Sequence, residues 1–591
     1  MEGDRGERRG PAGHSGRLSV ATTTLPDDTT VARPRTDDRR SPLWWAAVAL
    51  PSAVAVVAVV YTVATRRLTG DLHYVLAALR TGREAGYSPS EVFTHRPYFY
   101  RWFIAILDRL TSFGGGTPVR EALMGAVGVL LAAAAAYALY TALLRRVTGR
   151  EAALTAGATG LALALAPRND FLQPEWAAVV LTVLGVAAAI GPERPWRAAL
   201  LAAVPLGLAV MMKYSTAATA AIGILLVYTV DRGRAVRVAV VAMAAAAGLF
   251  GLSVLGGSHE WQWTEDMPQI NQSAMSRTGI HPHFILDRSV DFLADRAVAT
   301  PVLLLLPGAL LLVLTRVHGR WRRAELLLIA ATIGVAAQAV VVVQGNWFLY
   351  HGAQMPVLAA ATWGLAVGGA RRTPPWCFAA VSLVYGVLPV LYAEAPKGLQ
   401  RPWEVWAAGL VALLAAGVDA ARSRTTTARR GVPSAVLVTL SGVVCLTATI
   451  WPGSPHLVSH GKVTETSAQY LDEMRLAQSD ADRIRDRLPA NAPVLYLAFG
   501  DITYYVDHPA QCRYPVATFL QRSRFLPDVA DLPSFKENAD CVDHDPAPYA
   551  LLERPWFRPG RVDPALWQRV QAVYDCPHAR AGTRFVLCVR R

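Results

Sequence analysis

Thirteen separate apolar runs, each of about 15 to 25 residues, constrain the fold of this chain more than any other feature. A helix of about 20 apolar residues is long enough to cross the hydrocarbon core of a bilayer. Of the 591 residues, 53% are hydrophobic and only 17% are charged, which is typical of a polytopic α-helical membrane protein. The runs predict about 13 transmembrane helices, at residues 43–65, 122–144, 152–166, 174–190, 198–212, 216–230, 236–256, 301–315, 326–343, 347–370, 375–392, 403–418 and 433–451.

The two ends of the chain differ from this apolar middle. Residues 1–42 are rich in Arg, Asp, Thr, Pro and Gly and have almost no large apolar side chains, so they predict a disordered basic tail. No small-residue cleavage site follows the first run, and we expect that run to remain in the mature protein. Residues 453–591 alternate helical and strand patterns, which predicts a small α/β domain after a transmembrane domain at 43–452.

Lys and Arg residues are concentrated in the short connections between the apolar runs. The net charge of +14 is therefore interpreted as a signal for membrane orientation and not for nucleic-acid binding. Because cytoplasmic connections carry the excess of Lys and Arg, the amino terminus is predicted to be cytoplasmic and the C-terminal domain extracytoplasmic, in the plasma membrane. This assignment requires that the short run 103–107 does not cross. The basic connections are 145–150, 193–197, 231–234, 316–323, 371–372 and 421–430.

Cysteine placement gives a separate indication of the compartment. Four of the six cysteines lie in the C-terminal domain, and an even set of this kind is compatible with two disulfides in an oxidising compartment. The alternatives are four free thiols or a zinc site, but the spacing has no CxxC pair. The disulfide candidates are Cys512, Cys541, Cys576 and Cys588.

The polar, aromatic-rich loop 66–118 is the candidate active-site loop. It places Asp71 just past the first predicted span, and its run 103–107 is too short and too charged to cross a bilayer, so it is expected to lie along the surface. An ionisable group beside hydrocarbon is costly unless it has a partner or a use. The loop 257–300, with Trp261 and Trp263, has a composition suited to sugar stacking, to a lid or to an ordered cap.

Five short motifs lie in or beside the predicted connections and in the C-terminal domain. They are Gly-Asp-Leu-His-Tyr at 70–74, His-Arg-Pro-Tyr-Phe-Tyr at 95–100, Lys-Tyr within 212–215, Tyr-His within 344–351 and Arg-Tyr within 512–515. Together they resemble motifs of the GT-C glycosyltransferases, polytopic enzymes that use polyprenyl-phosphate sugars at the outer face of a membrane. The first is similar to the acidic motif of that family's first loop, and the second to a His-Pro-Pro-aromatic stretch, with Arg96 in place of the first Pro. In the fourth, Asn346 replaces a frequent Lys.

The resemblance implies a GT-C-like fold and a hexosyl- or pentosyltransferase activity, like that of mannosyl- and arabinosyltransferases of the cell envelope. Asp71 would be the base that takes the proton of the acceptor hydroxyl, and Lys213 would bind the carrier phosphate. The alternatives are a solvated carboxylate or helix N-cap at Asp71 and a snorkelling side chain at Lys213. The other candidates for substrate and carrier binding are His73, Tyr74, Arg96, Tyr100, Arg101, Asp170, Glu175, Tyr214, Asn346, Tyr350 and His351.

Asp170 and Glu175 could hold a divalent metal or orient the acceptor. A single carboxylate in each loop is a poor metal signature, so no obligatory cofactor is expected. The predicted partners are a polyprenyl-phosphate-linked sugar, an extracytoplasmic glycan, lipid or protein acceptor, and membrane lipids. The alternatives are a transporter, disfavoured by the absence of an internal repeat in the sequence, and a non-catalytic scaffold whose outer domain binds a partner.

Overall fold

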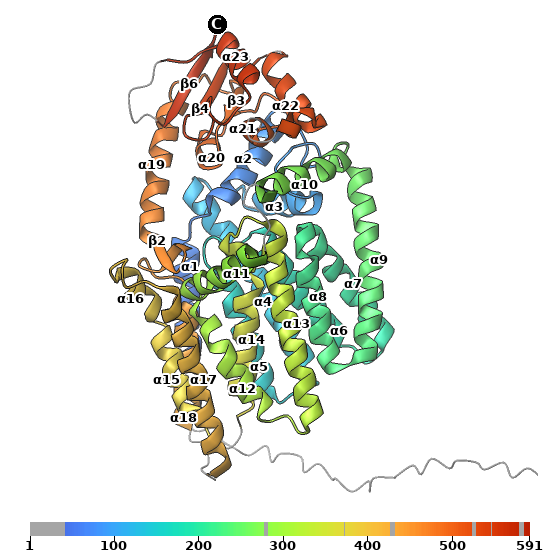
Figure 1. Ribbon diagram of the computed structural model, residues 1–591, viewed down its shortest axis with the longest axis vertical. Helices are drawn as coiled ribbons and strands as arrows, with labels where there is room; N and C mark the ends of the chain where they lie inside the picture. Colours follow the sequence, from blue (N-terminus) through green and yellow to red (C-terminus); the bar gives the residue numbers. More distant parts are fainter. Residues whose placement is uncertain are drawn as a thin grey trace, which may run out of the picture.

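A computed structural model describes residues 42–276, 282–370, 373–425, 432–522, 527–544, 546–577 and 584–591. A helical body forms most of the molecule, and a smaller unit containing a β-sheet lies at one end of it (Figure 1). The predicted tail 1–42 lies outside the described residues apart from Pro42, which begins the first helix.

Each of the thirteen apolar runs coincides with helix in the described chain. Five helices are long and apolar enough to cross a membrane, or up to eight if each bent pair is one span, so the count of thirteen stays a prediction. The predicted polytopic helical class is confirmed. The helices are α1 (Pro42–Thr65), α4 (Thr117–Leu143), α5 (Gly149–Ala164), α6 (Pro174–Ile190), α7 (Pro195–Met212), α8 (Ala217–Val230), α9 (Arg232–Gly256), α12 (Leu306–Leu314), α13 (Arg320–Gln344), α14 (Gln354–Gly368), α15 (Trp376–Tyr385), α16 (Leu388–Glu394), α17 (Pro402–Thr425) and α18 (Val432–Thr447).

Three of the predicted spans are interrupted. The run 301–315 divides into the 3-10 helix η2 (Pro301–Leu305) and α12, and the run 375–392 divides into α15 and α16 with a bend of 41°. The run 347–370 begins with the 3-10 helix η3 (Leu349–Gly352), so α14 starts later than predicted. Apolar composition alone does not show such breaks, because a 3-10 turn and an α-helix can bury the same side chains.

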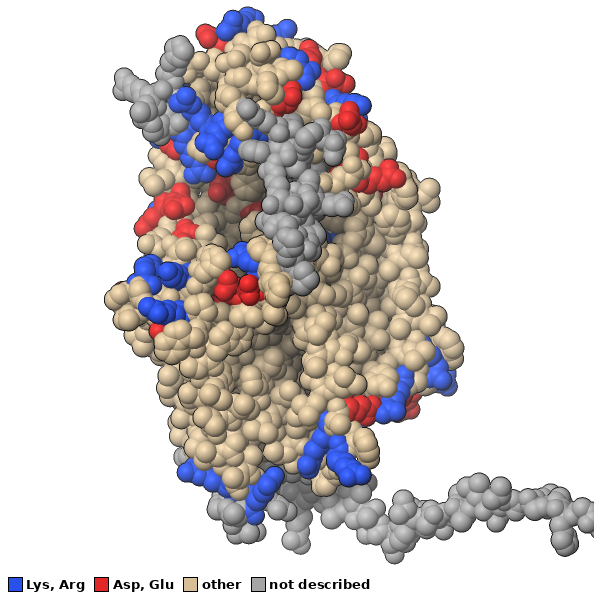
Figure 2. All heavy atoms as spheres, viewed as in Figure 1, with Lys and Arg blue, Asp and Glu red and all other residues tan. Residues whose placement is uncertain are grey.

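The surface of the helical body is consistent with a lipid environment. Figure 2 shows a broad band of uncharged atoms between two ends where Lys and Arg gather. Large apolar side chains of the long helices are well exposed, including Leu255 at 86% and Val335 at 71%. A soluble protein rarely exposes so continuous an apolar surface, so the chain is a multi-pass membrane protein.

Two helices from the loop 66–118 pack at the sheet-bearing end of the body. Helix α2 (Gly70–Glu84) bends by 54° from α1 and is buried from Leu72 to Gly82. Helix α3 (Tyr98–Leu110) contains the run 103–107 and is amphipathic, with Tyr100, Ile104 and Leu107 buried on one face. It follows α2 in the loop and is not among the helices long and apolar enough to span.

The loop 257–300 contains two helices. Helix α10 (Glu260–Ser276) follows α9, and α11 (Pro282–Ala299) leads into η2. The Gln262 side chain donates to Ser534 Oγ at 3.1 Å, and the Ser534 amide donates to Asp266 Oδ2 at 3.0 Å. These bonds attach α10 to the C-terminal unit.

The C-terminal unit is the predicted small α/β domain. A hairpin of β1 (Pro455–Ser459) and β2 (Lys462–Thr466) leads into α19 (Ser467–Arg485). Thr466 and Gln469 form a capping box at the start of α19. A four-stranded sheet follows in the order β3-β4-β6-β5, with β3 parallel to β4 and β6 antiparallel to both neighbours. The strands of this sheet and the helices between them are β3 (Val494–Leu497), α20 (Asp501–Val506), α21 (Thr518–Arg522), α22 (Pro533–Asp543), β4 (Tyr549–Glu553), α23 (Pro564–Val573), β5 (Tyr574–Asp575) and β6 (Phe585–Arg590).

The four cysteines of this domain form two disulfides. Cys512 is bonded to Cys541 with a Cα–Cα distance of 6.1 Å, and Cys576 to Cys588 with 4.3 Å. Cys377 and Cys445 are free. The first bond ties the segment after α20 to α22, and the second ties the residue directly after β5 to β6.

Reducing these bonds is expected to destabilise the domain. Closing a loop in the unfolded chain contributes about 2–4 kcal/mol per disulfide. The melting temperature of the full-length protein, followed with and without a membrane-permeant reductant, should fall on reduction. A Cys377→Ser protein, which keeps both disulfides, should melt like the wild type. Equal melting temperatures in both redox states would contradict the expectation.

Candidate active site

A cavity of about 530 Å³ lies where the membrane helices, α2, α10 and the C-terminal domain meet. It brings together positions that are hundreds of residues apart in the sequence, from Asp71 on α2 to Trp556 after β4. Most of the predicted site residues border this one space. They are Asp71, Tyr74, Arg96, Arg101, Lys213, Tyr214, Asn346, Tyr350 and His351.

Asp71 lies in the first turn of α2, where the helix dipole favours a negative charge. Its side chain keeps 31% of its surface exposed, and its Oδ2 lies 4.0 Å from Arg96 Nη2. Burial by itself lowers the pKa of Arg96, but the neighbouring Tyr350 and Asp71 outweigh that effect and raise it. Arg96 therefore stays cationic beside an accessible carboxylate.

Lys213 is held by a buried carboxylate at the ends of the membrane helices. The chain is extended at Lys213, directly after α7, and Lys213 Nζ donates to Glu175 Oε1 at 2.7 Å. Glu175 is fully buried in the first turn of α6 and also accepts from the Gln344 amide at 3.3 Å. Glu175 does not border the cavity, so it contacts Lys213 but would not contact a substrate in the cavity.

Tyr350 and His351 on η3 form the neighbouring part of the wall. Their rings meet edge to face with centroids 4.5 Å apart, and His351 Nε2 lies 3.5 Å from Lys213 Nζ. His351 is 1% exposed, and its Nδ1 has no hydrogen-bond partner among the described residues. A buried ring nitrogen without a partner at a cavity wall is a candidate for binding a ligand.

Besides Glu175, three predicted site residues do not line the cavity. His73 is buried between Asp501 and Glu121, with Nδ1 2.9 Å from Asp501 Oδ1 and Nε2 3.1 Å from Glu121 Oε1. Tyr100 donates to the carbonyl of Leu172 at 2.9 Å. Asp170 accepts from Arg296 on α11, with one of the two distances 2.9 Å. The polar atoms of these side chains bond to residues of other structural elements, so a direct role in binding the carrier does not fit their positions.

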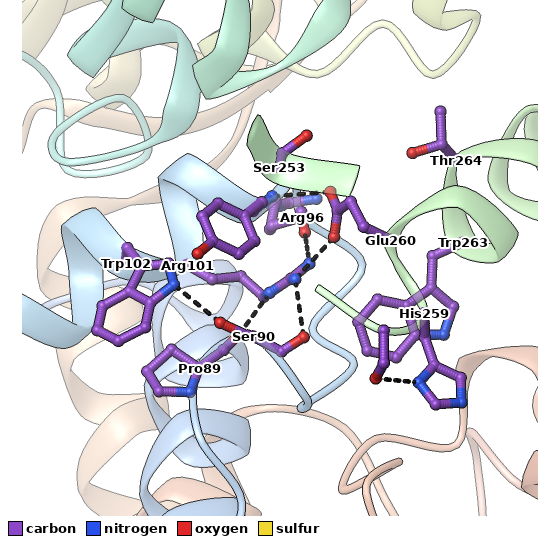
Figure 3. A network of polar contacts seen from close by, with 12 residues as sticks. Pro89, Ser90, Arg96, Arg101, Trp102, Ser253, His259, Glu260, Trp263 and Thr264 are labelled. Atoms are coloured by element: carbon purple, nitrogen blue, oxygen red, sulfur yellow. Dashed lines mark hydrogen bonds and ion pairs between the residues drawn. The ribbon is translucent and has the colours of Figure 1, made fainter. Parts of the chain in front are cut away.

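Arg101 borders the cavity but is already engaged with protein groups (Figure 3). Its guanidinium donates to Glu260 Oε2 at 2.7 Å and to the carbonyls of Pro89 and Arg96 at 2.8 Å each. Both partners of the ion pair are buried, with side chains 2% exposed. Glu260 also accepts from the Tyr98 amide at 3.0 Å. Arg101 therefore anchors the loop that carries Arg96 to the start of α10.

The backbone is unusual at two positions beside the cavity. His95 and Trp347 have φ angles of 56° and 54°, in the left-handed region that residues other than glycine seldom adopt. His95 precedes Arg96, and Trp347 follows Asn346, so each unusual residue adjoins one that borders the cavity. Backbone strain of this kind is concentrated at functional sites.

Similarity to known proteins is found among solved structures. No family model matches the chain, and no curated protein matches it. Among solved structures, ArnT from Cupriavidus metallidurans in the apo state matches 92% of this chain and 97% of its own, with 16% identity and a TM-score of 0.49. The same protein bound to undecaprenyl phosphate matches with 17% identity and a TM-score of 0.49, over 92% and 98%.

An archaeal oligosaccharyltransferase, AglB from Archaeoglobus fulgidus in complex with an inhibitory peptide and a dolichol-phosphate, also matches. The identity is 12% and the TM-score 0.36, over 92% of this chain and 74% of that one. Because the identities of 12–17% and the TM-scores of 0.36–0.49 are low, what this chain does is inferred from its own site.

The cavity is completed by residues that the sequence did not single out. Glu260 comes from α10, and Phe499, Thr518, Gln521 and Trp556 come from the C-terminal domain. Trp263, named from the sequence only as one of several aromatic residues, is buried and borders the cavity, whereas Trp261 is 53% exposed and does not. No local pattern distinguishes these positions, because long-range packing places them.

In the described part of the chain, no group of three or more His, Cys, Asp or Glu side chains is arranged to hold a metal ion. Asp170 forms an ion pair with Arg296, and Glu175 forms one with Lys213. Neither carboxylate is therefore placed as a ligand of the metal site that the sequence leaves as an alternative.

Proposed function

We propose that this protein is a membrane glycosyltransferase that moves a sugar from a polyprenyl-phosphate carrier to an acceptor on the extracytoplasmic side. The observation that carries the proposal is the single cavity in which an accessible carboxylate, Asp71, lies with Arg96, Lys213 and His351 at the ends of membrane helices. A carboxylate suits proton removal, and cations suit a phosphate leaving group.

The cavity also borders exposed apolar side chains, as a lipid-linked substrate requires. Val343 at the end of α13 is 65% exposed, Phe348 is 51% exposed and Tyr214 is 37% exposed, and all three line the cavity. An apolar polyprenyl tail can pack along such a surface while its phosphate head enters the polar interior. This opening supports a lipid carrier over a water-soluble nucleotide sugar.

In the proposed reaction, the Asp71 carboxylate accepts the proton of an acceptor hydroxyl. The acceptor oxygen forms a bond to the anomeric carbon, and the bond from that carbon to the phosphate oxygen breaks. The electron pair leaves with the polyprenyl phosphate, whose growing negative charge Arg96 and Lys213 stabilise. Glu175 keeps the Lys213 ammonium at the wall through its 2.7 Å bond, and Arg101 keeps the loop of Arg96 in position.

Purified full-length protein in lipid nanodiscs should release polyprenyl phosphate from polyprenyl-phosphate hexoses or pentoses when extracytoplasmic glycans, lipids or proteins are added. Mass spectrometry would follow the carrier, and a radiolabel on the sugar would identify both the sugar class and the acceptor class. Movement of the intact donor across the bilayer without cleavage would support a transporter. No cleavage and no movement with any donor would contradict both activities.

Replacing Lys213 is expected to weaken donor binding. A hydrogen bond to a charged group contributes about 1.5–3 kcal/mol, so the KM for the donor should rise by about 10- to 100-fold. Because Lys213→Met alone would leave Glu175 buried without its partner, the variant of choice is Lys213→Met/Glu175→Gln. The exposed Lys462 on β2 provides the control, Lys462→Met. An unchanged donor KM in a protein that melts normally would exclude the phosphate-binding role.

A further inference from the structure

One wall of the cavity is aromatic and comes mainly from the C-terminal domain. Tyr74 on α2 lies 5.1 Å from Phe499, and Phe499 lies 5.9 Å from Trp556, measured between ring centroids. All three residues border the cavity, together with the polar side chains of Thr518 and Gln521. Phe499 and Trp556 are half-buried, so each ring keeps a part of its surface exposed.

Hydrogen bonds hold this wall in place without a ligand. The amide of Phe499 donates to Glu553 Oε2 at 2.9 Å, and Arg584 Nε donates to Glu553 Oε1 at 2.9 Å. The Tyr74 hydroxyl lies 2.5 Å from Thr518 Oγ1. Glu553 itself is 3% exposed. A site whose side chains are fixed before binding spends little free energy on ordering them.

The turn that carries Phe499 touches the helix that carries Asp71. A Cβ at Gly500 would lie only 2.7 Å from the carbonyl oxygen of Gly70, the residue before Asp71. The aromatic wall therefore lies against the amino-terminal end of α2, the turn that carries Asp71. Figure 1 shows α2 directly beneath the sheet of the C-terminal domain.

We propose that Phe499 and Trp556, with Gln521, form a subsite for the sugar ring of a saccharide acceptor. The inference rests on the proposed function and narrows its acceptor class from glycan, lipid or protein to a glycan. One face of a sugar ring presents C–H groups that pack on aromatic rings, while its hydroxyls reach polar groups such as the Gln521 amide. The carrier phosphate belongs near the membrane helices because its tail stays in lipid, which leaves the outer wall to the acceptor.

The test measures saccharide binding directly and without turnover. Saturation-transfer-difference NMR would be recorded on full-length protein in nanodiscs, with methyl glycosides and disaccharides of hexopyranoses and of pentofuranoses as probes. Wild-type protein is expected to give saturation-transfer signals from the ring C–H groups of the saccharide. The saccharide affinity should be about tenfold lower in Trp556→Ala, and Trp556→Phe should recover part of that affinity. Trp261→Ala, at an exposed tryptophan outside the cavity, should bind like the wild type.

A second experiment determines whether the wall binds the acceptor saccharide or the donor sugar. A non-cleavable donor, a polyprenyl phosphonate with a C-glycosidic sugar, is added to the saccharide-bound protein. An acceptor subsite keeps its saccharide signals in the presence of this donor, and competition between the two would instead assign the wall to the donor sugar and overturn the inference. Saccharide signals that do not depend on Trp556, or no signals from any probe, would also overturn it.

Failure of this inference and failure of the proposed function give different experimental results. Sugar transfer with no Trp556-dependent saccharide binding would leave the glycosyltransferase assignment in place and remove the acceptor subsite. Saccharide binding that depends on Trp556, in a protein that cleaves no lipid-linked donor, would retain the subsite and remove the transferase assignment.

Discussion

An Asp71→Asn protein is expected to bind the lipid-linked donor normally and to transfer its sugar about 10³-fold more slowly than the wild type. The amide has nearly the shape of the carboxylate, so the packing of α2 should be preserved. It cannot accept the proton of the acceptor hydroxyl, because its oxygen is a far weaker base. The measurement is the single-turnover rate of polyprenyl-phosphate release with donor and acceptor both saturating.

The matched control is Asp472→Asn on α19, where the carboxylate is 69% exposed and pairs with Arg475. This protein should transfer sugar at the wild-type rate. A transfer rate in Asp71→Asn within a few-fold of the wild type would remove Asp71 as the base, whatever the class of enzyme. A raised KM for the donor with an unchanged rate would instead assign Asp71 to binding.

The second large effect is expected on stability, at the Arg101–Glu260 pair. Replacing Arg101 by Met leaves the Glu260 carboxylate buried without its cation, and breaking a buried pair on one side costs about 3–5 kcal/mol. The side chains are each 2% exposed, so solvent cannot replace the lost partner. The melting temperature should fall clearly, and the α10 segment should become more accessible to protease.

A double variant tests whether the charge is the cause. In Arg101→Met/Glu260→Gln no uncompensated charge remains, so much of the lost stability should return. Arg475→Met, at an exposed pair whose side chains are 77% and 69% accessible, should melt like the wild type. If Arg101→Met were as stable as Arg475→Met, the role of Arg101 as an anchor between α3 and α10 would be wrong.

The sequence predicted those parts of the site that depend on local patterns. Apolar runs identify helices because their length matches the bilayer, and the side on which a run ends is indicated by its basic connections. Asp71, Lys213 and His351 could therefore be assigned to one face before their contacts were known. They line one cavity although Lys213 and His351 are separated by 138 residues.

What the sequence could not predict depends on partners distant in the chain. His73 has the same local setting as Asp71, two residues away on α2, yet it faces Asp501, 428 residues further along. Asp170 pairs with Arg296 on α11, and the sequence around neither residue indicates this contact. The wall of Phe499 and Trp556 depends on how a whole domain docks, which neither composition nor periodicity encodes.

The contact between Gly70 and Gly500 restricts modular exchange of the C-terminal domain. A replacement domain would need a residue without a side chain at this turn, because a Cβ there would lie 2.7 Å from the Gly70 carbonyl oxygen. It would also need an acid in the place of Asp501 to face His73. The C-terminal domain and α2 therefore constrain each other's residues at this contact, because the Gly500 turn and Asp501 face Gly70 and His73.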